Sequence, residues 1–262
     1  MHTVEAEHLQ NGLTTKCIGR KILFCRTDES TNESAKRIAL QGAQEGTVVI
    51  AETQTGGRGR FGRKWFSPAG GLWLSVILRP KIPPSEAMKL ALVAGLAVAQ
   101  TLREAFALDA KTKWPNDVLI GGKKVCGILN EMNTVGDDIN YIVVGIGINA
   151  NFGKAALPGI LQESATSLQD ELGRPVELER LFTLLLKTLE ALYNQFLSEG
   201  FDAILAAWKR FSGILGEEVE VASSSERFVG LAVDVDRDGA LIVLVRDGSV
   251  RRVFSADISL PK

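Results

Sequence analysis

Histidine and cysteine are both scarce in this sequence of 262 residues. Its two histidines, His2 and His8, stand near the start, and its three cysteines form no C-x-x-C pair. Histidine-dependent nucleophilic triads and histidine-ligated metal sites are therefore nearly excluded. The isolated thiols of Cys17, Cys25 and Cys126 favour a reduced state over a disulfide framework. We expect a cytoplasmic protein.

The sequence also lacks an excess of either charge and any long hydrophobic run. Lys and Arg number 30 and Asp and Glu number 31, so no overall basic field exists to hold long nucleic acid. The start has no basic segment followed by an apolar core, as a signal peptide would. The longest charge-free apolar stretch, Leu90 to Leu102, has 13 residues, fewer than the ~20 that span a bilayer. We therefore expect a soluble protein with no membrane partner.

The composition is that of a globular protein of one or two domains. Hydrophobic residues make up 45% and charged residues 23%, enough for a full core. Strands are expected at 21–27, 47–51, 72–78, 111–113, 118–120, 126–132 and 141–149. Helices are expected at 30–42, 83–107, 177–197 and 201–211. This mixture predicts an α+β domain over 1–212 rather than a doubly wound parallel sheet.

The pattern changes after Gly216 to short β-rich runs. These runs are separated by Asp238-Gly239 and Asp247-Gly248, which are strong hairpin signals. We expect residues 213–262 to form a small antiparallel β-barrel beside the main domain.

A cluster of small polar residues opens the first expected helix. Ser30-Thr31-Asn32-Glu33 has the S-x-x-E form of a capping box, which predicts that Ser30 caps the helix. With Thr53-Gln54, the same residues also offer neutral hydrogen-bonding groups for an uncharged polar ligand head. The two roles are compatible.

The segment from Gly56 to Trp65 is rich in glycine and arginine. Four glycines within 56–62 favour neither helix nor strand, and consecutive N–H groups of such a loop can surround an anion. Arg58, Arg60 and Arg63 add planar groups that suit a carboxylate or phosphate. A flexible loop that closes over an anionic ligand is one interpretation, and a solvated surface loop or a single-strand nucleic-acid contact are others.

Two further segments carry functional side chains. In Lys113-Trp114-Pro115-Asn116-Asp117 the proline favours an extended backbone, and the side chains suit a phosphate, a ribose, a Mg²⁺ water or an amine. A turn after a strand is the alternative. Lys124 would face the same pocket as Asp117 across the Gly121-Gly122 hairpin. In residues 143–149, the glycines inside a buried strand indicate close approach of a ligand or backbone.

Together these segments resemble biotin protein ligases, also named biotin–[acetyl-CoA-carboxylase] ligases. Each motif is weak alone, but the set follows the family's order and spacing over about residues 21–260. The motifs are Ser30-Thr31-Asn32, Glu52-Thr53-Gln54, Gly57-Arg58-Gly59-Arg60-Phe61-Gly62-Arg63-Lys64-Trp65, Lys113-Trp114-Pro115-Asn116-Asp117, Lys124 with Gly127-Ile128-Leu129, and Gly145-Ile146-Gly147-Ile148-Asn149.

The resemblance implies a fold and a two-step reaction. The fold would be a class II synthetase-like catalytic domain over 1–212 with an SH3-like barrel over 213–262. Biotin and MgATP would form biotinyl-5′-AMP and pyrophosphate, and the biotinyl group would pass to one lysine of a biotin carboxyl carrier domain. A homodimer through the main sheet is also consistent with the family.

The resemblance also implies roles by motif position, although it assigns no metal ligands. Biotin would be bound by Ser30, Thr31, Asn32, Gln54, Arg58, Gly59, Arg60 and Lys124. The nucleotide would be bound by Arg60, Trp65, Lys113, Asn116 and Asn149. Catalysis would involve Arg58, Arg60, Lys113, Asp117 and Lys124, with Asp117 orienting or deprotonating the incoming lysine.

This sequence departs from the family pattern in three features. Phe61 stands where the family loop often has arginine, which removes one donor, and Asn130 replaces a usual apolar residue without an inferred consequence. Only 29 residues precede Ser30, too few for the helix-turn-helix domain of bifunctional members. We expect a monofunctional ligase that binds no nucleic acid.

Three rival functions stay open. A lipoate or octanoate ligase would share the catalytic architecture, although the Gly/Arg loop and the 113–117 motif favour biotin. A single-strand nucleic-acid binder is disfavoured by the net charge of −1. A non-catalytic biotin-binding or transcriptional protein is disfavoured by the retained Lys113, Asp117 and Lys124.

Overall fold

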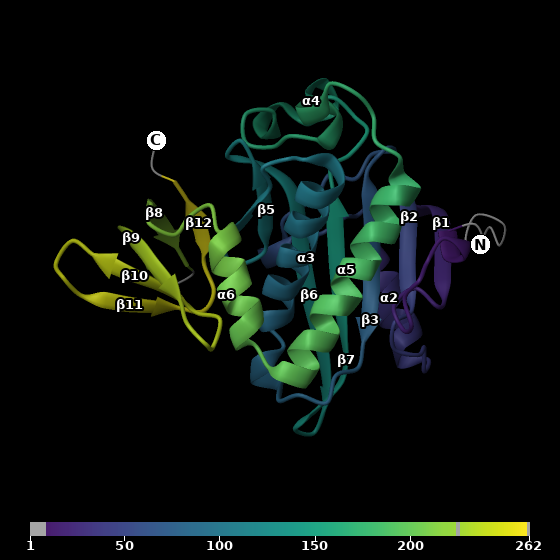
Figure 1. Ribbon diagram of the computed structural model, residues 1–262, viewed down its shortest axis with the longest axis horizontal. Helices are drawn as coiled ribbons and strands as arrows, with labels where there is room; N and C mark the ends of the chain where they lie inside the picture. Colours follow the sequence, from purple (N-terminus) through teal and green to yellow (C-terminus); the bar gives the residue numbers. More distant parts are fainter. Residues whose placement is uncertain (1–8, 224–225, 261–262) are drawn as a thin grey trace.

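The main body of the protein is built on a seven-stranded mixed sheet (Figure 1). The computed structural model describes residues 9–223 and 226–260. The strand order is β1-β2-β3-β7-β6-β5-β4, and only β1 and β2 pair in parallel. The strands are β1 (Ile22–Asp28), β2 (Val48–Gln54), β3 (Leu72–Leu78), β4 (Lys111–Lys113), β5 (Asp117–Ile120), β6 (Lys123–Val135) and β7 (Asp138–Ile148). The predicted α+β class is confirmed.

Helices cover both faces of this sheet. They are α2 (Thr31–Leu40), α3 (Lys89–Phe106), α4 (Leu168–Leu172), α5 (Leu178–Glu199) and α6 (Asp202–Phe211). Alternation along β2 separates two cores: Val48 and Ile50 pack into the cluster with α3 and α5, whereas Val49 packs with α2 on the other face. In Figure 1 the long helices α3 and α5 lie together across the sheet.

Helix α3 is the most apolar helix of the described residues. With the preceding 3₁₀ turn η2 (Pro84–Glu86), it is long and apolar enough to cross a membrane by composition. However, 72% of its most apolar window is buried inside the protein, between the sheet and α5. The apolar side chains of α3 are therefore part of the hydrophobic core.

The C-terminal region forms a second, five-stranded antiparallel sheet beside α6 (Figure 1). Its order is β11-β10-β9-β8-β12. The strands are β8 (Glu218–Ala222), β9 (Arg227–Val235), β10 (Leu241–Val245), β11 (Val250–Val253) and β12 (Asp257–Ser259). The expected small antiparallel β unit is confirmed. Strand β12 belongs to it as well, although the sequence did not predict this strand. The division into 1–212 and 213–262 stays a prediction.

Two local predictions were wrong. Ser30 occupies the N-cap of α2, but its side chain makes no capping hydrogen bond, and the Glu33 carboxylate pairs with Lys36 and Arg58 rather than with the Ser30 N–H. Residues 114–116 form a tight turn between β4 and β5 rather than an extended segment, with a cis peptide before Pro115.

Two glycine turns lie where the sequence predicts hairpins. Gly121 and Gly122 join β5 to β6 with φ of 55° and 77°, as a two-residue hairpin requires. The turn at Gly239 is fixed to the main body, because Trp114 donates its indole N–H to the Gly239 carbonyl at 2.9 Å.

Candidate active site

A cavity of about 590 Å³ lies between the seven-stranded sheet, the glycine-arginine loop and the C-terminal strand β12. Every site residue expected from the sequence lines this cavity. Those residues are Ser30, Thr31, Asn32, Gln54, Arg58, Gly59, Arg60, Trp65, Lys113, Asn116, Asp117, Lys124 and Asn149. The fold therefore brings together segments that lie far apart in the chain, although the role of each residue stays a prediction.

One part of the cavity is neutral and strongly hydrogen-bonded. The Thr31 backbone N–H and hydroxyl both donate to Gln54 Oε1, at 2.8 and 3.1 Å. Gln54 Nε2 donates to the Ser67 hydroxyl at 2.8 Å. The buried Ser75 hydroxyl lies 2.8 Å from Thr31 Oγ1 and 2.6 Å from Asn32 Oδ1. These groups are fixed in direction and carry no charge, as a polar uncharged ligand head requires.

The glycines inside β7 make room for two of these side chains. A Cβ at Gly145 would overlap Asn32 Oδ1, and a Cβ at Gly147 would lie 2.5 Å from Trp65 Nε1. The close approach predicted from the glycines is thus made by side chains of the site. Any larger residue at either position would displace a cavity wall.

The opposite part of the cavity is cationic. Lys113 and Asp117 face each other across the β4–β5 hairpin, and Lys124 Nζ pairs with Asp117 Oδ1 at 2.5 Å. Lys124 Nζ also lies 5.1 Å from the centre of the Trp65 ring. Burial lowers the pKa of Lys113, and the nearby Asp117 carboxylate only partly offsets this. Two lysines and one carboxylate leave this part of the cavity suited to an anion.

The glycine-arginine loop is tied to the C-terminal unit. Arg60 donates to the Ala256 carbonyl at 3.1 Å and to the Ser255 hydroxyl at 2.9 Å. Arg63 forms an ion pair with Asp257. Burial lowers the pKa of Arg60, although Asp257 opposes this. Two of the loop's three arginines thus lie at the boundary between the two sheets.

The third arginine, Arg58, points toward α2. Its Nη1 lies 2.9 Å from Glu33 Oε1 and its Nη2 lies 3.7 Å from Glu29 Oε1, and its side chain is half exposed. A ligand anion would therefore have to compete with Glu33 for this guanidinium.

Phe61, which replaces the family's usual arginine, lies at the outer tip of the loop. It has a positive φ of 56° and is largely exposed. The guanidinium carbons of Arg60 and Arg63 lie 4.7 and 5.7 Å from its ring centre. Its ring contacts both guanidinium groups by cation–π interaction.

The side chains predicted to contact the nucleotide differ in whether the protein already occupies their hydrogen-bonding groups. Trp65 Nε1 is buried and has no hydrogen-bond acceptor within the described ranges. Asn149 is buried and donates to the Thr166 carbonyl at 2.9 Å, and Asn116 donates to the Ile128 carbonyl at 2.7 Å. A buried N–H without a partner costs free energy unless a ligand supplies an acceptor. Trp65 is thus the most available of these donors.

The sequence reasoning missed two segments that line the cavity. The segment 157–165 holds Lys124, because the Lys124 N–H donates to the Ser164 carbonyl at 2.9 Å and its carbonyl accepts from Thr166 N at 2.9 Å. Asp257 and Ser259 enter from β12. The first segment has short 3₁₀ turns without periodicity, and β12 has three residues, so neither gives a pattern to detect.

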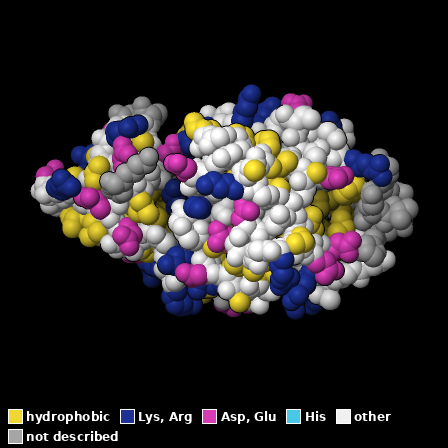
Figure 2. Space-filling view, turned by 90° about the horizontal axis from the view of Figure 1, so that it is seen from above, with side chains coloured by type: hydrophobic (Ala, Val, Ile, Leu, Met, Phe, Trp, Pro, Cys, Tyr) yellow, Lys and Arg dark blue, Asp and Glu magenta, His cyan; other side chains and the backbone are white. Residues whose placement is uncertain are grey.

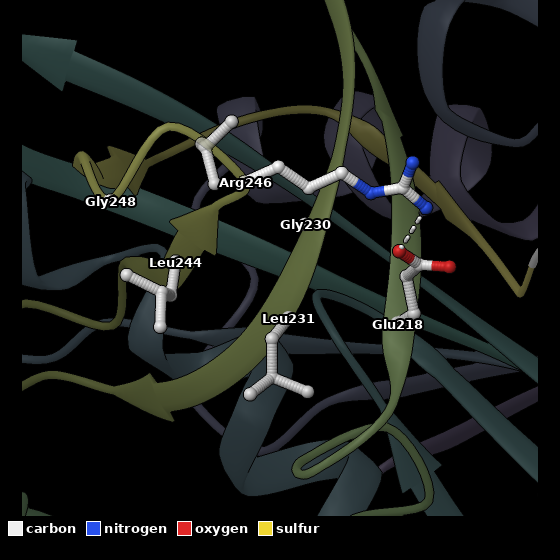
Figure 3. A pocket seen from close by; sticks show the side chains of 7 residues that line it. Glu218, Gly230, Leu231, Leu244, Arg246 and Gly248 are labelled. Atoms are coloured by element: carbon white, nitrogen blue, oxygen red, sulfur yellow. Dashed lines mark hydrogen bonds and ion pairs between the residues drawn. The ribbon is translucent and has the colours of Figure 1, made fainter.

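A second, smaller hollow of about 370 Å³ lies on the C-terminal sheet (Figure 3). An ion pair between Glu218 and Arg246 crosses it at 2.9 Å. It holds none of the expected site residues. Its lining residues are Glu218, Gly230, Leu231, Leu244, Val245, Arg246 and Gly248.

The described residues offer few side chains for nucleophilic catalysis or metal binding. Cys126 is fully buried, and burial raises the pKa of its thiol far above the ordinary range. Within residues 9–223 and 226–260, no group of three or more His, Cys, Asp or Glu side chains could hold a metal ion.

The comparisons with known proteins agree with this geometry. Residues 23–149 match the Biotin/lipoate A/B protein ligase family, and residues 214–260 match the Biotin protein ligase C terminal domain. The chain is 36% identical over 250 residues to the bifunctional ligase/repressor BirA of Bacillus subtilis, which covers 95% of this chain and 77% of the relative. The chain belongs to the biotin protein ligase family.

Other biotin protein ligases match over nearly their whole length. The biotin–[acetyl-CoA-carboxylase] ligase of Paracoccus denitrificans is 36% identical over 89% of this chain and 97% of its own. The structure of the Aquifex aeolicus biotin protein ligase in complex with biotin and ATP superposes with a TM-score of 0.79 at 30% identity. It covers 92% of this chain and 98% of that one.

Proposed function

We propose that this chain is an ATP-dependent biotin protein ligase. It activates biotin to biotinyl-5′-AMP and transfers biotin to a specific lysine of a biotin carboxyl carrier protein domain. The observation that carries this proposal is the single cavity that joins a neutral hydrogen-bonding end to a cationic end. Biotin has an uncharged cyclic urea at one end and a carboxylate at the other, and therefore matches both ends.

The first step has to bring two anions together. A carboxylate attacks a phosphate, and both repel each other in water. Lys113, Lys124 and Arg60 line the cavity and supply positive charge where the acyl phosphate forms. One preorganised donor typically contributes ~3–4 kcal/mol to the transition state, and positioning of two reactants ~7–11 kcal/mol. Charge and positioning thus suffice without histidine or cysteine.

The second step needs an acceptor lysine without its proton. Asp117 lines the cavity and is held by Lys124 at 2.5 Å. We assign to Asp117 the orientation or deprotonation of the incoming amine. Its carboxylate is the nearest acidic partner of the cationic cluster, and release of Lys124 to the acyl phosphate leaves it free to accept that proton.

Mg²⁺ accompanies ATP as part of the substrate. Mg²⁺ typically keeps several waters and binds through one or two carboxylates plus the substrate's phosphates. Asp257 is the carboxylate of the cavity lining that the role of Asp117 leaves available, and it would hold the ion in exchange for its pair with Arg63. The ion supplies further charge neutralisation on the phosphates.

Incubation with ATP, Mg²⁺, biotin and a carrier domain tests the function directly. The mass of the carrier domain should rise by one biotinyl group, only when ATP is present. A carrier domain whose acceptor lysine is replaced by arginine is the control. An unchanged mass of the intact domain would contradict the proposal.

A lipoate ligase is the second candidate, because the matched family includes lipoate ligases. The separate match of residues 214–260 to a biotin protein ligase C-terminal domain favours biotin. A titration that compares biotin with lipoate in the same assay distinguishes the two.

We further propose that the chain acts without binding DNA. Lys and Arg are interspersed with Asp and Glu on the face in Figure 2, and the net charge is −1. The Paracoccus relative, which the chain covers to 97%, is named only as a ligase. A gel-shift assay should show no retarded DNA with biotin and ATP present; a salt-sensitive complex would contradict this.

A homodimer through the main sheet is a further proposal. The pairing of β5 with β6 ends at Gly127, whereas β6 continues to Val135. The backbone of residues 130–135 thus offers a free strand edge within the described residues, the type of edge that pairs with a second chain. Sedimentation should give twice the chain mass; a monomer at all concentrations would contradict the proposal.

A cytoplasmic location is proposed from the thiols. Cys17, Cys25 and Cys126 are all free. Free cysteines are typical of a reducing compartment, where ATP is also available. Cell fractionation should recover the protein with cytoplasmic enzymes, and recovery from the membrane or exterior would contradict this.

A further inference from the structure

The amide of Asn32 is held on both of its polar atoms. Its Nδ2 donates to Glu131 Oε2 at 2.8 Å and to the Leu129 carbonyl at 3.2 Å. Its Oδ1 lies 2.6 Å from the Ser75 hydroxyl. Asn32 is buried and lines the cavity. Both amide hydrogens are thus used by the protein, and what Asn32 can still offer a ligand is a lone pair on its oxygen.

Glu131 is the strongest determinant of this orientation. An ionised carboxylate only accepts hydrogen bonds, so the amide atom that faces it must be the nitrogen. A bond to a charged acceptor is about twice as strong as the neutral bond to the Leu129 carbonyl. The Ser75 hydroxyl can donate or accept, and therefore permits either orientation. Without the charge at Glu131, only the weaker bond to the Leu129 carbonyl opposes turning of the amide N–H groups toward the cavity.

Lys36 holds the carboxylate of Glu131 in place. Its Nζ lies 2.6 Å from Glu131 Oε1 and 2.8 Å from Glu33 Oε1. Burial opposes the charge on Lys36, but the hydrogen bonds to Glu131 and Glu33 outweigh it and raise the pKa of Lys36. The lysine therefore stays charged, and one oxygen of Glu131 is left for Asn32.

We propose that Glu131 is a positioning residue that makes the cavity select a ligand head with N–H donors. Glu131 acts through Asn32: it fixes the amide so that an oxygen acceptor, and not an N–H donor, is available. The proposal rests on the proposed function, in which the head is the cyclic urea of biotin with its two N–H groups. It extends the site to a carboxylate that does not itself line the cavity.

The first test is the nearly isosteric Glu131→Gln variant. Loss of one oriented hydrogen bond should raise the KM for biotin roughly tenfold, since such a bond contributes ~1–1.5 kcal/mol. The KM for ATP should stay within about twofold, because the change is at the neutral end of the cavity. Glu218→Gln is the matched control, since it removes a paired carboxylate that does not line the cavity and lies on the C-terminal sheet (Figure 3). Equal biotin KM values for both variants would overturn the proposal.

A double-mutant cycle with Asn32→Ala separates positioning from general structure. If Glu131 acts through Asn32, the biotin KM of the double variant should equal that of Asn32→Ala alone. Effects that multiply would mean that Glu131 acts by another route, and would overturn the proposal.

A comparison of biotin with a modified biotin tests the acceptor role of Asn32 even if Glu131→Gln does not fold. The wild type should discriminate strongly between biotin and an analogue methylated on a urea nitrogen, and Asn32→Ala should reduce that discrimination. Equal discrimination by both proteins would overturn the proposal. A wild type that transfers no biotin would instead refute the proposed function, so the two failures are distinguishable.

Discussion

At the scale of single residues, the site is an arrangement of few charges with fixed partners. Lys124 contacts both Asp117 and the face of Trp65, so its ammonium group has a defined position before any ligand arrives. Lys113 is partly buried near the same carboxylate. This preorganisation explains how a site without histidine can join two anions.

Lys124→Ala should reduce the rate of biotin-dependent pyrophosphate release by roughly 10²–10³-fold, the effect of losing one preorganised donor. Thermal unfolding should remain cooperative, because Lys124 lies at the cavity and not in the core. Lys123→Ala, the neighbouring lysine, is the control and should retain the wild-type rate. An unchanged rate in Lys124→Ala would reject the role of this lysine.

The partly buried Lys113 predicts a pH dependence of ATP binding. Its pKa is lowered by burial, so its charge is lost at a lower pH than the ~10.4 of a free lysine. The KM for ATP should therefore rise in the alkaline range, as the pH passes the lowered pKa. Lys113→Arg should flatten this rise, because a guanidinium keeps its proton there. Parallel profiles for the two proteins would contradict the assignment.

At the scale of elements, the sequence predicted most strands and helices but not every contact between them. Strand β3 was visible as a short, nearly continuous apolar run, and helix α5 was visible because its apolar residues follow the helix period. The capping box at Ser30 did not form: Glu33 pairs with Lys36 of the same helix and with Arg58, which comes from the distant glycine-arginine loop. Tertiary partners of this kind are invisible to local spacing.

The site was predicted more completely than the fold around it. Resemblance supplied all thirteen expected residues, and each lines the cavity. The walls formed by 157–165 and β12 were not predicted, since they depend on backbone pairing to Lys124 and to β8. Glu131 was likewise missed, because its role comes from one hydrogen bond to a distant side chain.

Two glycines, one in β7 and one in α3, should differ sharply in their tolerance of alanine. Gly147→Ala should displace Trp65 and reduce adenylate formation at least tenfold, because its Cβ would lie 2.5 Å from Trp65 Nε1. Gly95→Ala in α3 should be tolerated and stabilise the protein by ~0.5–1 kcal/mol, since its Cβ meets Ile128 at 3.6 Å. Denaturant unfolding and adenylate assays check both; an active Gly147→Ala enzyme would contradict the account.

At the scale of the whole molecule, the cavity is shared between the two sheets. Asp257 and Ser259 of β12 line it, and Arg60 and Arg63 of the main body bind residues 255–257. The C-terminal unit therefore fixes part of the loop that closes the cavity. Ligand binding should therefore be coupled to the contacts between the C-terminal sheet and the main body.

Asp257→Asn should raise the KM for ATP several-fold, because Arg63 loses its anionic partner at the cavity edge. The thermal midpoint should change little, since an exposed ion pair contributes only ~0–1 kcal/mol. Glu226→Gln, which removes the exposed pair with Arg251 elsewhere in the same sheet, should leave the KM unchanged. Identical behaviour of the two variants would argue against coupling through β12.

The central claim is that one cationic cavity neutralises a carboxylate and a phosphate long enough to join them. Native mass spectrometry of the chain after incubation with biotin and MgATP, without a carrier domain, tests this most directly. The account predicts one biotinyl-5′-AMP retained per chain in the wild type and little in Lys124→Ala. Retention of only unreacted biotin or ATP by the wild type, or equal amounts of adenylate in both proteins, would contradict it.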